Sequence, residues 1–159
     1  MPSIHFKNTF DPDEFGRVMV IHGGYSNERD VSLESGTAIL SALKANSINA
    51  FGWDPRYDSL TNHLEKGVDR AFIALHGKGG EDGLIQGLLE SYQIPFTGSG
   101  IISSAIAMNK TASKRIFLSE NLPVPNYKLL RYKEDLQCAE ADIGFPMILK
   151  PVSEGSSLG

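Results

Sequence analysis

Cysteine is almost absent from this chain of 159 residues, in which Cys138 is the only one. A single thiol cannot form an intrachain disulfide, so the composition favours a reducing compartment. Blocks of lysine and arginine are missing too, and the formal net charge is −4. Because nucleic-acid binders present clustered basic residues, the sequence predicts no nucleic-acid partner.

Long apolar runs and targeting signals are lacking as well. No run approaches the ~20 apolar residues that span a bilayer. Residues 1–15 have neither the basic start nor the apolar stretch of a signal peptide. We therefore expect a cytoplasmic protein without a membrane partner, in which residues 1–16 form a loosely ordered N-terminal extension.

Between residues 17 and 108, short apolar runs alternate with amphipathic segments. This alternation predicts a parallel sheet with helical crossovers, a Rossmann-like α/β domain. The expected strands are 18–21, 50–53, 71–75 and 96–97, and the expected helices are 31–44, 84–92 and a third from residue 101. On the first helix, the 3.6-residue spacing predicts a core face made of Val31, Ala38, Ile39, Ala42 and Leu43.

The pattern changes in residues 109–159. Helices are expected at 110–122 and 135–143, and strands at 127–130 and 147–150. A glycine- and serine-rich loop closes the chain. A strand followed by such a loop normally continues into another element, and a sheet that stops there has an uncovered edge. We therefore expect this second domain to be incomplete.

The segment 22–36, HGGYSNERDVSLESG, joins the first strand to the first helix. Helix N-termini carry partial positive charge and hold carboxylates or phosphates. Glu28 and Asp30 add negative charge there, which favours a ligand that also has a cation, such as an amino acid. The alternative is simple capping by Asp30 or Ser32 with a surface pair between Glu28 and Arg29.

The segment 74–90, ALHGKGGEDGLIQGLLE, places His76 directly after an apolar strand. Ligands bind at the carboxyl ends of parallel strands, and a histidine there can bind substrate or titrate near neutral pH. The glycines around His76 keep the backbone thin, which favours function over a histidine that only bonds loop carbonyls. Glu81 and Asp82 are predicted to cap the following helix.

Two further segments, 95–110 and 144–159, each combine glycine turns with a lysine. PFTGSGIISSAIAMNK ends at Lys110, at the expected domain junction, and GFPMILKPVSEGSSLG carries Lys150 before a loop rich in donors. A lysine beside free N–H and hydroxyl groups makes a sensible nucleotide site, although solvated lysines on surface loops would read similarly. The chain has no GxxxxGK[ST] or GxSxG pattern, and its histidines show no metal-ligand spacing.

Taken together, these segments resemble the D-alanine–D-alanine ligase family of the ATP-grasp superfamily. The match runs over roughly residues 17–159 through HGKGGEDGLIQG, GGYSNERDVSLESG, PFTGSG, SKRIFLSENLPVP and ILKPVSEGSSLG, in the family's order. The resemblance implies a substrate-binding pre-ATP-grasp domain at 17–108. It also implies an incomplete beginning of the ATP-grasp domain at 109–159.

The resemblance implies that ATP phosphorylates one D-alanine and that the amine of a second attacks the acyl phosphate. The dipeptide would serve peptidoglycan synthesis, with Mg²⁺ or Mn²⁺ at the phosphates and a homodimer as the assembly. By the same resemblance, Glu28 would hold the ammonium of the first D-alanine and His76 would line its pocket. Lys110 and Lys150 would contact ATP, and Ser156 would act with Glu28 in catalysis by orienting the second D-alanine.

In two respects the sequence departs from the family. Asn109 stands where the family usually has Asp. More importantly, the family's adenine pocket and metal ligands lie beyond Gly159, so the chain alone is expected to lack ligase activity. The alternatives are a non-catalytic dimerising or binding module, and a ligase that joins D-alanine to D-lactate or D-serine.

Overall fold

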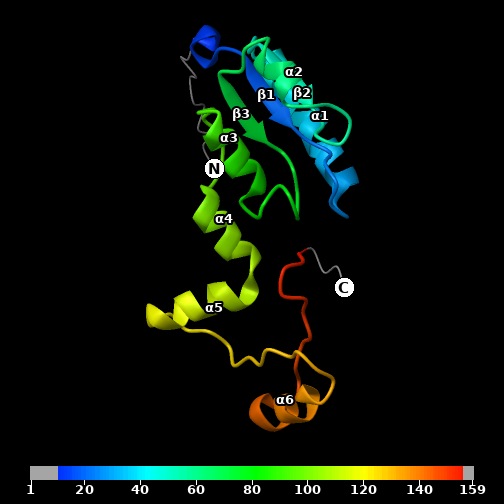
Figure 1. Cartoon of the computed structure of the whole chain (residues 1–159), viewed down its shortest axis with the longest axis vertical. Coiled ribbons are helices and arrows are strands. Elements are labelled where there is room, and N and C mark those ends of the chain that lie inside the picture. Colours follow the sequence, from blue (N-terminus) through cyan, green and yellow to red (C-terminus); the bar gives the residue numbers. More distant parts are fainter. Residues whose placement is uncertain (1–10, 156–159) are drawn as a thin grey trace, which may run out of the picture. The chain divides into compact units, whose positions relative to one another are not determined.

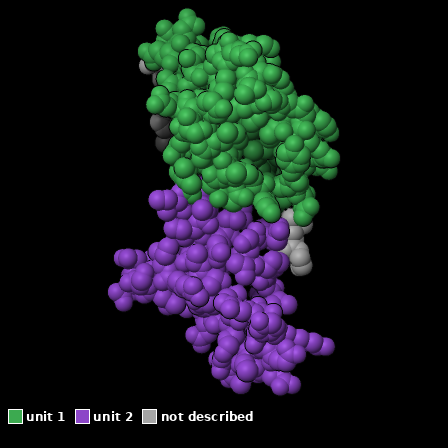
Figure 2. Space-filling model, in the orientation of Figure 1, with its two compact units in different colours: residues 1–101 green, residues 102–159 purple. Residues whose placement is uncertain are grey.

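The computed structural model describes residues 11–155. The chain divides into two compact units, Met1–Ile101 and Ile102–Gly159, which Figure 2 shows in green and purple. The domain boundary that the sequence suggests, between residues 108 and 109, stays a prediction. Within residues 11–155, no helix combines the length and the apolar character needed to cross a membrane.

The first unit is built on a parallel sheet in the order β2-β1-β3 (Figure 1). Its strands are β1 (Val18–Ile21), β2 (Ala50–Trp53) and β3 (Arg70–Ile73). The central strand β1 is buried along its whole length, as expected for a strand covered on both faces. The predicted α/β class is confirmed.

The predicted fourth strand is reduced to a single bridge. Phe96 pairs in parallel with Ala71, whose amide donates to Pro95 at 2.8 Å while Thr97 donates to Ala71 at 3.1 Å. The chain therefore adds two hydrogen bonds at the outer edge of β3 and then leaves the sheet.

Helices cover both faces of this sheet. The long helices are α1 (Arg29–Ala45) and α3 (Leu84–Ser91), close to their predicted bounds. A short α2 (Thr61–Leu64) and the 3-10 helix η1 (Pro12–Phe15) were not predicted from the sequence. Asp11 starts η1 by accepting a 3.0 Å bond from the amide of Asp13, so the end of the expected loose extension is ordered.

Alternate residues of β1 serve two different cores. Met19 and Ile21 belong to the larger cluster, which includes Leu89 of α3. Val18 belongs to a smaller cluster against which Leu40 of α1 packs. Side chains of a strand alternate between faces, so α1 and α3 cover opposite faces of the sheet.

The predicted core face of α1 is wrong in part. Leu43 packs on the smaller cluster as expected, but Val31 is 55% exposed, and Ala38 and Ala42 are exposed as well. The buried positions are instead Ser32 and Gly36. Small residues there let the helix approach the sheet closely, and periodicity based on apolar residues overlooks them.

The second unit contains most of α4 (Ile101–Met108), together with α5 (Lys110–Ser119) and α6 (Asp135–Ile143). All three helices were predicted, although α5 stops before the expected residue 122. Asn109 caps α5, because its side-chain oxygen accepts a 3.0 Å bond from the amide of Ala112.

The predicted strands at 127–130 and 147–150 are wrong: neither segment forms a strand in the described part of the chain. A strand exists only through hydrogen bonds to a neighbour, and among the described residues the sheet consists of β1, β2 and β3 with the single bridge at Phe96. Ile148 and Leu149 are consequently 80% and 75% exposed.

Candidate functional site

Two glycines turn the chain from β1 into α1. Gly23 and Gly24 have φ values of +80° and +72°, a left-handed conformation that glycine adopts without steric cost. The amide of Gly23 donates to the hydroxyl of Ser32 at 2.8 Å, and that hydroxyl donates to the carbonyl of Ala74 at 2.7 Å. Ser32 therefore does not cap α1 but ties it to the ends of β1 and β3.

Arg29 and Asp54 form an ion pair beside this turn. Their closest atoms, Nη2 and Oδ2, lie 2.6 Å apart. Burial by itself raises the pKa of Asp54, but the Arg29 hydrogen bond and the amides of Arg56 and Gly24 outweigh it and hold the pKa below its usual value. The surface pair between Glu28 and Arg29, the alternative considered from the sequence, is not what Arg29 forms.

Glu28 is the residue that precedes α1, and its side chain makes no capping bond. Its Oε1 atom is buried and has no hydrogen-bond partner. Its Oε2 atom lies against Gly77, where an added Cβ would come within 2.8 Å of it. Because a buried polar group without a partner is costly, this oxygen makes Glu28 a candidate ligand-binding residue.

His76 lies in the same neighbourhood as Glu28. Ser26 joins the two loops, since its hydroxyl accepts from the Glu28 amide at 3.1 Å and donates to the His76 carbonyl at 2.7 Å. The ring of His76 has Ser35 Oγ at 3.1 Å from Nε2 and Glu81 Oε1 at 3.7 Å from Nδ1. The structure thus brings the loops of Glu28 and His76 together at the carboxyl edge of the sheet.

The two acidic residues after His76 have separate roles. Asp82 accepts from the amides of Gly79 at 2.8 Å and Leu84 at 3.2 Å, but the predicted capping is wrong, because Gly83 is the N-cap of α3 and no side chain makes a capping bond there. Glu81 instead faces His76. A carboxylate beside one ring nitrogen and a hydroxyl beside the other orient the imidazole.

His22 was not singled out from the sequence, although it begins the first motif. Its side chain lies between Gly36 of α1 and Gly52 of β2, where added Cβ atoms would come within 2.3 Å of the His22 Cβ and 2.7 Å of its Nε2. Burial lowers the pKa of His22, Asp54 partly offsets this, and Arg29 adds to the lowering. The sequence signal that could have identified His22 is its position directly after a strand and before two glycines.

The two predicted lysines both lie in the second unit. The amide of Lys110 donates to Val152 at 3.0 Å, and its Nζ donates to the carbonyl of Glu154. Lys110 is therefore held against the loop that follows Lys150, which is exposed. Ser156 lies outside the described residues.

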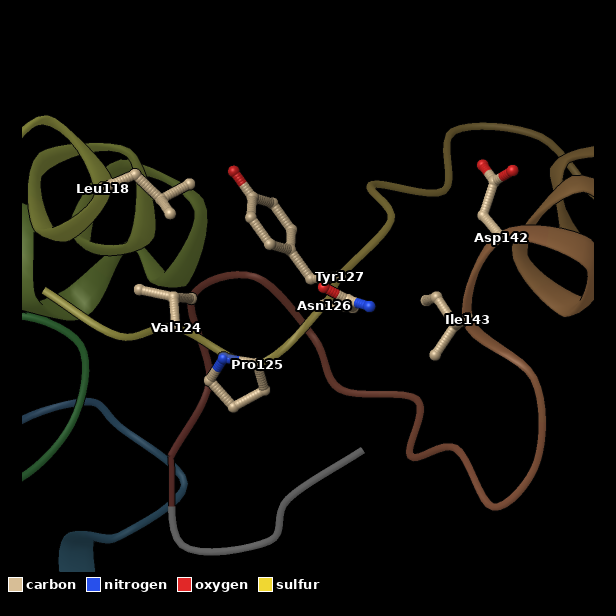
Figure 3. Close-up of a pocket in the computed structure, with 7 residues that line it drawn as sticks. All are labelled: Leu118, Val124, Pro125, Asn126, Tyr127, Asp142 and Ile143. Carbon is tan, nitrogen blue, oxygen red and sulfur yellow. The ribbon is translucent and has the colours of Figure 1, made fainter. Parts of the chain in front are cut away.

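A hollow of about 440 Å³ in the second unit contains none of the predicted site residues (Figure 3). Beside it, Lys128 pairs with Asp142 at 2.6 Å. Elsewhere in residues 11–155, no three His, Cys, Asp or Glu side chains gather in a way that could hold a metal ion. The lining residues are Leu118, Val124, Pro125, Asn126, Tyr127, Asp142 and Ile143.

The sequence comparisons agree with one another. Residues 54–99 match the family model described as D-ala D-ala ligase N-terminus. The D-alanine–D-alanine ligase of Ectopseudomonas mendocina is 52% identical over 157 residues, covering 99% of this chain and 50% of the relative. The D-alanine–D-alanine ligase of Aromatoleum aromaticum is 51% identical over 146 residues, covering 92% of this chain and 47% of the relative.

Solved structures agree with the sequence relatives. The D-alanine–D-alanine ligase of Bacillus anthracis superposes with a TM-score of 0.71 at 38% identity, over 90% of this chain and 47% of that one. The same enzyme complexed with ATP gives a TM-score of 0.68 at 36% identity, over 87% and 48%.

The sequence matches and the superpositions thus define an α/β chain with the fold of the N-terminal half of longer proteins. The chain belongs to the D-alanine–D-alanine ligase family, and it matches the N-terminal portion of that family's members. It spans about half the length of the curated relatives that it matches.

Proposed function

We propose that this chain is the substrate-binding portion of a D-alanine–D-alanine ligase. The whole protein would join two D-alanines at the expense of ATP, through an acyl phosphate, in the cytoplasm and for peptidoglycan synthesis. The observation that supports this most is the buried, unpartnered Oε1 of Glu28 at the rim of the sheet. An ammonium group supplies the donor that this oxygen lacks.

Glu28 would hold the ammonium of the first D-alanine, and His76 would line the same pocket. Their loops are joined through Ser26, so both side chains are placed by the same turn. The first turn of α1 adds the partial positive charge of a helix N-terminus, which suits the substrate carboxylate that accompanies the ammonium. A small zwitterion therefore finds opposite charges at one location.

Lys110 and Lys150 would contact the phosphates of ATP from the second unit. Lysine is a compact cation suited to phosphate oxygens, and the position of Lys110 beside the loop at 152–154 places it next to the loop that Lys150 begins. Mg²⁺ or Mn²⁺ would neutralise charge on the transferred phosphoryl group. Ser156 would orient the second D-alanine, and the whole protein would form a homodimer.

The first experiment is a titration of the ¹⁵N-labelled chain with D-alanine, followed by NMR. We expect weak binding that shifts the amides of Glu28 and Gly77 and that is lost in Glu28→Gln. The matched control is Glu34→Gln, an exposed carboxylate on α1, which should bind as the unmodified chain does. Shifts of equal size in both variants would remove Glu28 from the site.

A second experiment tests the activity. The chain alone should release phosphate from ATP with D-alanine only at background. When it is joined in frame to the remaining half of the Ectopseudomonas mendocina relative, we expect D-alanine-dependent phosphate release. In that protein, Glu28→Gln should lower kcat/KM for D-alanine by about 10- to 150-fold, because a charged hydrogen bond contributes roughly 1.5–3 kcal/mol. Lys150→Ala should instead raise KM for ATP.

A further inference from the structure

Arg29 follows Glu28 directly in the sequence, yet its guanidinium is bound elsewhere. Nη1 donates to the carbonyl of Gly24 at 2.8 Å and to Asp54 Oδ1 at 3.2 Å, while Nη2 donates to Asp54 Oδ2 at 2.6 Å. Both side chains are largely buried, at 17% and 16% exposed. The arginine is thus held by the turn and by the residue that follows β2.

Asp54 is itself fixed by the backbone. Its Oδ1 accepts the amides of Gly24 at 3.1 Å and Arg56 at 3.0 Å. The turn leaves room for the pair only because residue 23 is glycine. A Cβ there would come within 2.5 Å of Asp54 Oδ2 and 2.7 Å of Arg29 Nη1. The local backbone is therefore arranged around the ion pair.

A free guanidinium next to Glu28 would compete with any cationic ligand. Arginine–carboxylate pairs are among the strongest hydrogen-bonded contacts in proteins, and Glu28 offers an oxygen that is buried and unpartnered. Asp54 offers Arg29 a bidentate partner instead, and two amides hold that carboxylate in place.

We propose that Asp54 is a positioning residue that holds Arg29 away from Glu28 and so keeps the Glu28 carboxylate available to the ammonium of a small amino acid. This inference rests on the proposed role of Glu28. If Asp54 only stabilised the turn, its removal would lower the affinity through a distorted backbone. In the proposed role, the released Arg29 itself lowers the affinity by pairing with Glu28.

The test is a comparison of Asp54→Ala with the double variant Asp54→Ala/Arg29→Met, in which methionine retains an apolar stem. D-Alanine titrations of the ¹⁵N-labelled chain should show at least a tenfold loss of affinity in Asp54→Ala. Removing Arg29 as well should restore affinity to within about threefold of the unmodified chain. A double variant that binds no better than Asp54→Ala would overturn the proposal. Asp58→Ala, in the same loop, should leave the affinity unchanged.

A second measurement does not depend on D-alanine. The Nε–H signal of Arg29 should not respond to Glu28→Gln in the unmodified chain, because the guanidinium is bonded to Gly24 and Asp54. In Asp54→Asn, which keeps an acceptor for the two amides and so preserves the turn, Glu28→Gln should shift that signal clearly. Equal responses in both backgrounds would overturn the proposal. If the unmodified chain binds no D-alanine, the proposed function fails. The response of the Arg29 signal to Glu28→Gln in the two backgrounds still shows whether Asp54 keeps Arg29 away from Glu28.

Discussion

His22 and Gly36 are in such close contact that a Cβ added to Gly36 would lie 2.3 Å from the Cβ of His22. Gly36→Ala must therefore displace α1 from the sheet or move His22. We expect the free energy of unfolding to fall by about 1–3 kcal/mol, the usual cost of overpacking. Urea denaturation followed by circular dichroism measures this change.

Gly87→Ala is the matched control on α3. Its Cβ would meet only the side chain of Ile101, at 3.6 Å, which is an ordinary contact. Since alanine is a better helix former than glycine, this variant should be stabilised by up to about 1 kcal/mol. Equal stability of the two variants would show that Gly36 is not needed for the approach of α1.

Ser32→Ala should clearly lower the free energy of unfolding, although serine is polar and is mostly found on protein surfaces. The hydroxyl of Ser32 is buried and serves both the Gly23 amide and the Ala74 carbonyl. Leaving these groups without a partner costs about 1–3 kcal/mol. Ser41→Ala, on the exposed side of the same helix, should change stability by no more than ~0.5 kcal/mol. Thermal unfolding of both variants gives the comparison.

These serine and glycine positions explain where sequence reasoning about α1 fell short. The 3.6-residue period located the helix, but scoring apolar residues placed Val31 in the core because it gave Ser32 and Gly36 no weight. The small size of Gly36 and the hydroxyl of Ser32 bring α1 close to the sheet. A pattern of apolar residues detects neither of them.

The candidate site was more predictable than the second unit. Glycine turns after two parallel strands place Glu28 and His76 at the same edge by topology alone, so their proximity follows from the sequence. The partner of Arg29 does not, because Asp54 is 25 residues away along the chain and nothing local distinguishes it from other acidic residues. The strands expected at 127–130 and 147–150 depended on neighbours that periodicity cannot supply.

Acidification should weaken the fold partly through Asp54. The pKa of Asp54 is raised by burial but lowered further by Arg29 and two amides, so it lies below its ordinary value. Aspartate in the unfolded chain titrates near about 3.9. The stabilisation is thus complete above about pH 4 and is lost as the pH falls through the lower folded pKa. The difference in unfolding free energy between the unmodified chain and Asp54→Asn should shrink below about pH 4. If the difference in unfolding free energy stayed constant from neutral to strongly acidic pH, Asp54 would not contribute to the acid sensitivity of the fold.

The amides of residues 147–150 should exchange with solvent far faster than those of β1. β1 is hydrogen-bonded to strands on both sides, and such amides exchange only through large-scale opening. Residues 147–150 form no strand, and Ile148 and Leu149 are mostly exposed. Hydrogen exchange read by mass spectrometry or NMR tests this directly.

If the chain is joined to the remaining half of a relative, the same amides should become protected, because apolar side chains with an unpaired backbone gain both burial and hydrogen bonds when a neighbouring strand is supplied. Slow exchange in the chain alone would mean that these residues already pair, and fast exchange in the joined protein would mean that they are loop in the whole fold as well.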